Sequence, residues 1–331
     1  MSQNARLSIF VSMKTISPPG IFNDAIGPVM RGPSSSHTAG SHRIGRVLKQ
    51  LANNQISSVI FKFHREGSLA TTYQTQGSDI GLAAGLLDME ITDPQMPKAL
   101  ELAAENGLDI SFHIEDFQAD HPNTYDCYLK LKNGGEIYAR ALSTGGGIIE
   151  FVKINEFNFS RSMDLPCLFI YGNKEIVHEY KEINLSNPVL KAQIFRTEFI
   201  SGADDELLIV EFNILKPIWP DNQINALFCS LVDPVYPVLG YTGSTLPFST
   251  AEDLENSPEL LDKELWELAV DYESARSGIY PEEVIERMDE LVLVFMEAID
   301  TGLSGTVYQD RILGAQSPGF NEAINSELLL P

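Results

Sequence analysis

The stretch RGPSSSHTAG at residues 31–40, with the helical pattern that follows it, decides how the first part of the chain folds. The Gly32-Pro33 pair breaks the preceding structure, and the three serines behind it carry the hydroxyls that helix N-caps prefer. Apolar residues then recur at helical spacing, namely Ile44, Val47, Leu48 and Leu51. The pattern predicts a helix that begins in the serines and buries one face.

The same stretch has the composition of an anion-binding site. Glycine lets the backbone approach a ligand, and hydroxyls with free N–H groups at a helix N-terminus attract a carboxylate or a phosphate. His37 adds a side chain that titrates near neutral pH. A simpler interpretation stays open, in which one serine caps the helix and the other hydroxyls are solvated. His42 lies about 140° from His37 on a helical wheel, so the two histidines need not share a site.

Three further segments are candidate sites. Gly67–Ala70 and Gln76–Asp79 frame a second turn that enters a helix, His121–Thr124 leads into a strand, and Ser143–Gly147 contains three consecutive glycines. Each also has a purely structural explanation: a helix cap at Asp79, an extended turn, and a bulge or hinge. The sequence contains no Walker loop, Rossmann fingerprint, nucleophile elbow or HExxH motif.

Predicted strands and helices are interspersed over the first 155 residues, which indicates an α+β or α/β domain. Residues 164–240 predict a smaller α+β region, and residues 241–258 a polar linker. The remainder predicts helices, with one through Leu260–Tyr272 and a wide apolar stripe over 284–299. In the first domain we expect helices starting near Ser34, Ser78 and Pro97, strands at 58–63, 110–114, 125–131, 136–141 and 148–154, and a hairpin turn at Asn133-Gly134.

The chain is strongly acidic. Its 331 residues include 23 Lys+Arg and 46 Asp+Glu, which gives a net charge of −23. We therefore expect no binding to nucleic acid or anionic membrane, because phosphate recognition needs clustered basic residues. Residues 1–50 are the exception, with six basic residues and one acid. This basic block either attracts a small anion or pairs with acidic residues elsewhere in the chain.

The three cysteines, Cys127, Cys167 and Cys229, are isolated in the sequence, and no CxxC pair occurs. Their spacing therefore predicts buried free thiols rather than a metal site in this chain. The first 20 residues lack the apolar run of a signal peptide, and no stretch approaches the ~20 apolar residues of a membrane span. We expect a cytoplasmic protein, where thiols stay reduced.

In this order the four motifs resemble one family, the iron–sulfur-dependent L-serine dehydratases (L-serine ammonia-lyases), and specifically their beta domain. The resemblance covers residues 20–157, and its most specific part is GPSSSHT at 32–38. Matching residues also include Ile21-Phe22, Ile26-Gly27-Pro28, GSLATTY at 67–73, HPNT at 121–124 and GGG at 145–147.

The resemblance implies an α+β fold in three parts. The first, at 18–158, is the beta domain, which is similar to the allosteric substrate-binding domain of phosphoglycerate dehydrogenase. A small ACT-like α+β domain follows at 160–240. Residues 255–331 resemble the helical start of the family's alpha domain, here truncated.

The implied reaction is α,β-elimination of L-serine, or of a related β-hydroxy amino acid, to pyruvate and ammonia. A [4Fe-4S] cluster, held in the family by alpha-domain cysteines, acts there as a Lewis acid toward the substrate hydroxyl. This chain has no cysteine beyond Cys229, so we expect no metal ligand in it and a separate alpha-type chain as partner, or a homo-oligomer. His37 is the catalytic candidate. The substrate-binding candidates are Arg31, Ser34, Ser35, Ser36, Thr38, Gly77, Ser78, Asp79 and Asn123, with Arg43 as another source of positive charge.

One departure from the family pattern concerns the chemistry. The family's helix-entry motif His-Gly-Thr-Asp is Gln76-Gly77-Ser78-Asp79 in this chain. An amide cannot exchange a proton at neutral pH, so an acid–base role at this position is lost. The alternatives are therefore a non-catalytic regulatory module that binds an anion or amino acid, or an inactive truncated homologue.

Overall fold

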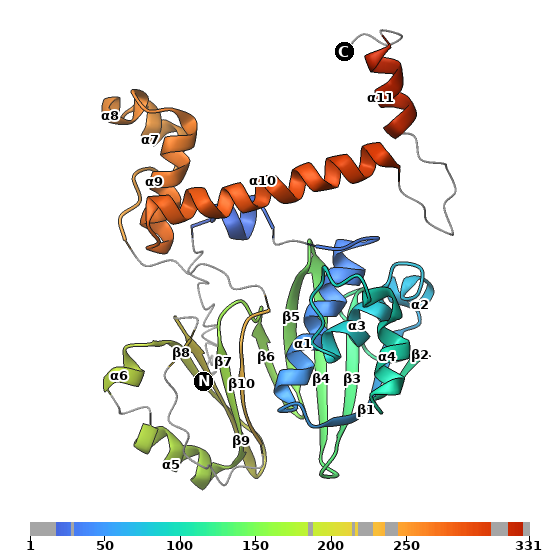
Figure 1. Ribbon diagram of the computed structural model, residues 1–331. Coiled ribbons are helices and arrows are strands. Elements are labelled where there is room, and N and C mark those ends of the chain that lie inside the picture. Colours follow the sequence, from blue (N-terminus) through green and yellow to red (C-terminus); the bar gives the residue numbers. More distant parts are fainter. Residues whose placement is uncertain are drawn as a thin grey trace, which may run out of the picture. The chain divides into compact units, whose positions relative to one another are not determined.

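The computed structural model divides the chain into two compact units, residues 26–240 and residues 1–25 together with 241–331 (Figure 1). The residues that the structure describes are 18–27, 30–184, 188–213, 216–217, 228–235, 244–305 and 317–326.

The first unit is built around a six-stranded sheet in the order β2-β1-β3-β4-β5-β6. β1 and β2 are parallel, and the other neighbouring pairs are antiparallel. A parallel pair needs a crossover connection, and here the crossover carries three helices. The turn between β3 and β4 places Gly134 at φ +86°, as the Asn133-Gly134 pair predicts. The strands are β1 (Ile56–His64), β2 (Asp109–Glu115), β3 (Thr124–Leu131), β4 (Glu136–Gly145), β5 (Ile148–Ile154) and β6 (Phe157–Arg161).

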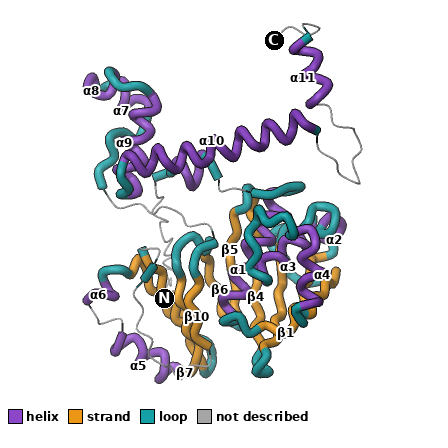
Figure 2. The backbone as a smooth tube through the Cα atoms, viewed as in Figure 1, coloured by secondary structure: helices purple, strands orange, loops and turns teal. Residues whose placement is uncertain are grey.

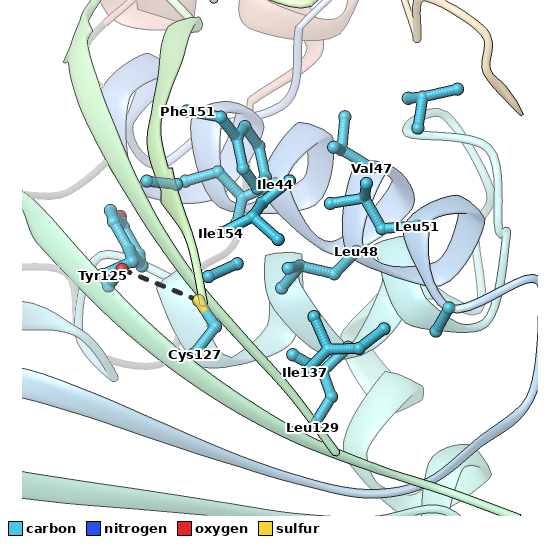
Figure 3. Packing of buried hydrophobic residues seen from close by; sticks show 14 of the residues in the cluster. Ile44, Val47, Leu48, Leu51, Tyr125, Cys127, Leu129, Ile137, Phe151 and Ile154 are labelled. Carbon is cyan, nitrogen blue, oxygen red and sulfur yellow. Dashed lines mark hydrogen bonds between the residues drawn. The ribbon is translucent and has the colours of Figure 1, made fainter. Parts of the chain in front are cut away.

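Helices cover one face of this sheet, as Figure 2 shows in purple against the orange strands. They are α1 (Gly40–Leu51), α2 (Leu69–Thr72), α3 (Ser78–Leu86) and α4 (Ala99–Glu105), with a short 3₁₀ turn at Met96–Lys98. The apolar stripe of α1 is fully buried against β3, β4 and β5 (Figure 3). Along β3 the side chains alternate, so Tyr125, Cys127 and Leu129 face this core while Tyr128 and Lys130 are exposed. The predicted helix therefore packs against the sheet through the apolar face that the sequence predicts.

Glycines line the crossing of α1 and α3. A Cβ at Gly81 would lie 2.4 Å from the carbonyl oxygen of Thr38, and one at Gly85 would lie 2.1 Å from that of His42. Both separations are far below van der Waals contact, so neither position accepts a side chain without displacing a helix. The crossing fixes the start of α3 beside the start of α1.

A second, antiparallel sheet in the order β10-β7-β9-β8 completes the first unit. One of its faces packs against the helices that follow β7, through residues such as Val177 and Leu190. The other face joins the core of the six-stranded sheet through Phe169, Leu207 and Ile209. The elements are β7 (Cys167–Asn173), α5 (Lys174–Asn184), α6 (Pro188–Lys191), β8 (Ile194–Ser201), β9 (Asp205–Phe212) and β10 (Phe228–Val232).

The second unit is helical in the part that the structure describes. The segment that opens with Pro18 packs against α9: the Ile21 N–H donates to Glu273 at 2.7 Å, and Arg276 Nε donates to the Pro18 carbonyl at 2.7 Å. Glu273 and Arg276 are buried, and a Cβ at Gly20 would lie 2.7 Å from the guanidinium carbon. A buried charge pair thus anchors this segment. The helices are α7 (Ala251–Glu255), α8 (Pro258–Leu261), α9 (Leu265–Ser277), α10 (Pro281–Ser304) and α11 (Ser317–Asn325).

The structure confirms a chain of mixed α and β structure with a helical C-terminal region, and it corrects two local predictions. The stretch predicted as a linker, 241–258, contains α7, which begins with a capping box at Thr250. The single helix predicted through Leu260–Tyr272 is interrupted, because a second capping box between Glu264 and Glu267 starts α9 afresh. Within the described residues, no helix combines the length and the apolar character needed to cross a membrane.

Candidate functional site

The SSSHT motif forms a wide helical turn, Ser35–Ala39, that continues into α1. Ser34 precedes the turn in extended backbone, and its hydroxyl oxygen accepts the His37 amide N–H at 3.2 Å. The hydroxyl oxygens of Ser34 and Ser36 lie 3.2 and 3.1 Å from Nδ1 of His37. A single serine is enough to cap a helix, so the additional hydroxyl contacts orient the imidazole.

A second turn closes on the first. Thr38 Oγ1 donates a hydrogen bond of 2.7 Å to the backbone carbonyl of Gln76. The next residue, Gly77, has φ +72°, and a Cβ there would lie 2.9 Å from Thr38 Oγ1. Glycine suits both the left-handed backbone and the close approach of Thr38. The Gln76–Asp79 motif is thereby joined to the SSSHT motif.

The other two motifs reach the same place from the sheet. Ser143 Oγ, on β4, donates to the Ser36 carbonyl at 2.7 Å. Asn123, just before β3, donates from Nδ2 to the Ser143 carbonyl at 3.3 Å, and its side-chain oxygen accepts a hydrogen bond from the Ser68 hydroxyl. Motifs spread over residues 31–147 therefore meet in a single hydrogen-bonded network.

The glycine run forms the turn between β4 and β5. Gly145, Gly146 and Gly147 have φ values of +113°, +60° and +77°, which favour glycine at all three positions. A Cβ at Gly147 would lie 2.8 Å from Sδ of Met30. The turn therefore packs beside the chain that leads into the SSSHT motif.

Two titratable groups are buried in this region. The His37 side chain is 7% exposed, and its Nε2 has no hydrogen-bond partner among the described residues. Burial lowers the pKa of His37 below its ordinary value, so the imidazole is neutral at pH 7. Burial raises the pKa of Asp79, whose carboxylate accepts the Ile80 N–H at 2.8 Å and forms no ion pair with any described residue. A neutral imidazole and a desolvated carboxylate are both suited to ligand binding or proton exchange.

Four predicted binding residues lie outside the network, and one of them is Asp79, whose carboxylate accepts the N–H of the adjacent Ile80. Arg31 donates to the Asp93 carbonyl at 2.8 Å, and the Ser35 side chain is exposed. Ser78 is buried beside Tyr125: burial raises the pKa of this phenol to about 12, and neighbouring hydroxyls, including that of Ser78, oppose the shift. The structure thus brings Ser34, Ser36, His37, Thr38, Gly77 and Asn123 together. Arg31 bonds a backbone carbonyl elsewhere, and the buried Ser78 hydroxyl has no hydrogen-bond partner among the described residues.

Three of the four described basic residues of the block at the start of the chain are paired with acidic side chains, and Arg31 donates to a backbone carbonyl instead. The ion pairs join Arg43 to Asp164, Arg46 to Asp88 and Glu90, and Lys49 to Asp88. This finding supports pairing with acidic residues, the alternative left open by the sequence, over a positive field that attracts anions. His42 is also separate from the site, since its Nε2 donates to the Met89 carbonyl at 2.8 Å.

Two side chains of the network, those of Ser68 and Ser143, are not among the predicted binding residues. Both lie in motifs that the sequence singles out: Ser68 follows Gly67, and Ser143 stands two residues before Gly145. No local pattern reveals that Ser143 reaches Ser36, because 107 residues separate them.

The described residues contain no group of three or more His, Cys, Asp and Glu side chains that fits a metal ion. Burial raises the pKa of Cys127 and of Cys167 well above 9.0, and that of Cys229 to about 11. The thiolate is the form that binds metal, so these protonated thiols are poor ligands.

No family model matches the chain. It is 40% identical over 150 residues to a Bacillus subtilis (strain 168) protein described as probable L-serine dehydratase, beta chain; the match covers 45% of this chain and 67% of the relative. It is 37% identical over 133 residues to the L-serine dehydratase beta chain of Peptoniphilus asaccharolyticus, covering 40% of this chain and 59% of the relative. With 40% identity over two thirds of the first relative, the chain belongs to the family of L-serine dehydratase beta chains.

Proposed function

We propose that the chain takes part in α,β-elimination of L-serine, or of a related β-hydroxy amino acid, to pyruvate and ammonia. The observation that carries this proposal is the state of His37. Its Nδ1 is held by two serine hydroxyls, and its buried Nε2 has no partner among the described residues, at the point where four motifs meet. The names of both relatives refer to L-serine, which supports the substrate.

The elimination needs an anchor for the substrate carboxylate and a group that accepts the α-proton. Hydroxyls and N–H groups at the start of a helix favour an anion, so we assign carboxylate binding to Ser34–Thr38. Around them we place Arg31, Gly77–Asp79 and Asn123 as further substrate-binding residues.

We propose that His37 accepts the α-proton of the substrate. In the tautomer that carries its proton on Nδ1, the imidazole donates to a serine oxygen and Nε2 presents a lone pair. The lowered pKa keeps Nε2 unprotonated at neutral pH and therefore ready to accept a proton.

The [4Fe-4S] cluster implied by the resemblance does not fit the described residues of this chain. The three cysteines of this chain lie on separate strands, β3, β7 and β10, and burial keeps their thiols protonated. We therefore propose that a separate alpha-type chain holds the cluster. This chain contributes carboxylate binding and the proton acceptor.

The second sheet supports an ACT-like domain at 160–240. The chain runs β7-α5-α6-β8-β9 and later β10, and the sheet order is β10-β7-β9-β8. A strand–helix–strand unit with another strand paired between its two strands is the arrangement of a split β-α-β fold. Together with the beta domain at 18–158 and the start of the alpha domain at 255–331, this gives the three parts that we propose, in a cytoplasmic protein.

A second candidate is a non-catalytic module that binds an amino acid or a small anion. Gln76 favours it, because the family's histidine at this position is an amide here. The structure limits the weight of that change: the Gln76 carbonyl bonds Thr38, while the side chain is only half-buried. Any residue at this position supplies the same carbonyl.

Titration calorimetry of the full chain with L-serine, D-serine and inorganic phosphate tests the site. We expect L-serine to bind, His37→Gln to abolish binding, and His113→Gln, on an exposed position of β2, to leave it unchanged. A chain that binds L-serine but yields no pyruvate with its alpha-type partner is the regulatory module. A wild-type chain that binds none of the three ligands contradicts both functions.

A further inference from the structure

The helix α10 carries more of the exposed large apolar side chains than any other described element. It spans 24 residues, and Val284 is the one residue of it in the buried class. Phe295 is 51% exposed and Met296 is 53% exposed. Soluble proteins rarely leave a contiguous apolar surface of this kind uncovered, and such surfaces mark sites of association.

Six of the exposed apolar side chains follow helical spacing along one side of α10, namely Ile285, Val292, Phe295, Met296, Ile299 and Leu303. Two others, Leu293 and Val294, fall outside this stripe. This spacing is that of a helix which packs against another helix. α11 does not cover the whole stripe, since it approaches α10 at Leu303, where Phe320 and Ile324 lie nearby.

Acidic residues occupy the opposite side of α10. At 100° per residue, Glu283, Glu286, Glu290 and Glu297 fall away from the apolar stripe. Asp289 and Asp300 fall along one border of it, and Arg287 is the one basic residue of the helix. A second copy of the chain would bring the same acidic border against this one, and like charges repel.

We propose that α10 docks a different protein chain, which presents an apolar helix bordered by lysine or arginine residues. Apolar burial would supply the affinity, and the acidic border would select the partner. Under the proposed function this partner is the alpha-type chain, and only that identification rests on the proposed function.

Two fluorescent amphipathic peptides of about 18 residues test the surface. Both carry leucine at the positions of one helical face. At the remaining positions one peptide carries lysine and the other carries glutamate. Their binding to the full chain is followed by fluorescence anisotropy, at about 0.3 M salt to screen remote charges. We expect the lysine peptide to bind at least tenfold more tightly than the glutamate peptide.

Variants locate the binding. Phe295→Ser with Ile299→Ser should weaken the lysine peptide by about tenfold or more, because central apolar residues dominate interfaces. Phe195→Ser, which alters a side chain of β8 that is 61% exposed, is the matched control and should leave binding unchanged. Asp289→Lys with Asp300→Lys should reverse the preference toward the glutamate peptide.

Equal binding of the two peptides, or binding that survives the Phe295 and Ile299 changes, overturns the proposal. So does a stable dimer of the chain alone that dissociates in the variant with Phe295→Ser and Ile299→Ser, because α10 would then be covered by a second copy. Measuring L-serine binding to the wild type and to the variant with Phe295→Ser and Ile299→Ser separates the two proposals. If neither protein binds L-serine, the proposed function is contradicted, and the peptide result for α10 still stands.

Discussion

Replacement of Gly85 by alanine tests whether the glycine-lined crossing of α1 and α3 positions the candidate site. The added Cβ would lie 2.1 Å from the His42 carbonyl oxygen and 2.7 Å from the Arg46 amide nitrogen. Both atoms belong to the backbone of α1, which cannot rotate away as a side chain can. The two helices must therefore separate by about 1 Å.

The expected cost follows from the packing. Overpacking a well-packed core costs about 1–3 kcal/mol, and we expect the upper end because the colliding atoms are backbone. A gap of about 1 Å also removes a substantial part of the dispersion energy between the facing side chains. At about 2–4 °C per kcal/mol for a unit of this size, the melting temperature should fall by roughly 10 °C.

Circular dichroism measures the melting of the full chain, and amide hydrogen exchange reports on the site. We expect faster exchange over Ser34–Ala39, since separation of the helices breaks the Thr38–Gln76 bond. Gly319→Ala in α11 is the control, because its Cβ meets nothing within 4 Å, and it should melt at or slightly above the wild-type temperature. A Gly85→Ala protein that melts within about 1 °C of wild type, with unchanged exchange, refutes the reasoning.

Three further predictions concern the site itself. Asp79→Asn should raise the melting temperature at pH 7 and weaken L-serine binding, because burial raises the pKa of this carboxyl and its charged form destabilises the fold. The gain in melting temperature should shrink as the pH falls and the wild-type carboxyl becomes protonated. A variant that melts below the wild type at every pH would contradict this. Because the pKa of His37 is lowered in the folded chain, the imidazole of the unfolded chain is protonated first as the pH falls, and the free energy of unfolding should decline below pH 6.5. Denaturant titrations should show a smaller decline for His37→Gln. Identical pH profiles of the variant and the wild type would be evidence against this effect. Ser143→Ala should cost about 1–3 kcal/mol in the same titrations, because it leaves the Ser36 carbonyl without its donor, whereas Thr144→Ala, at an exposed neighbour, should be near neutral; equal costs would remove the special role of Ser143.

The elements that follow from local chemistry are those that the sequence predicts well. The stripe Ile44–Leu51 becomes the buried face of α1, and Gly107 ends a helix at φ +71°. The errors are also local. In the linker and in the break between α8 and α9, capping boxes at Thr250 and Glu264 start helices that the apolar pattern alone does not show.

The site divides in the same way. Ser34, Ser36 and His37 are neighbours in sequence, and their mutual hydrogen bonds follow from one helical turn. The fate of the basic block could not be predicted, because Arg43 finds Asp164 only after the two sheets have packed into one core. An ion pair between distant residues leaves no periodic signal in the sequence.

The sequence by itself determined the acidic character of the chain, the mixed α and β class, the order of four small-residue motifs and, through them, the family. These properties depend on residue identity and on spacing within a few turns. Only the tertiary structure decided that Thr38 meets Gln76 and that Ser36 meets Ser143, and that the His37 side chain is buried with one ring nitrogen unpartnered among the described residues. The reason is physical: these contacts depend on strand register and on a helix crossing that only glycine permits, and both arise when distant segments exclude water together.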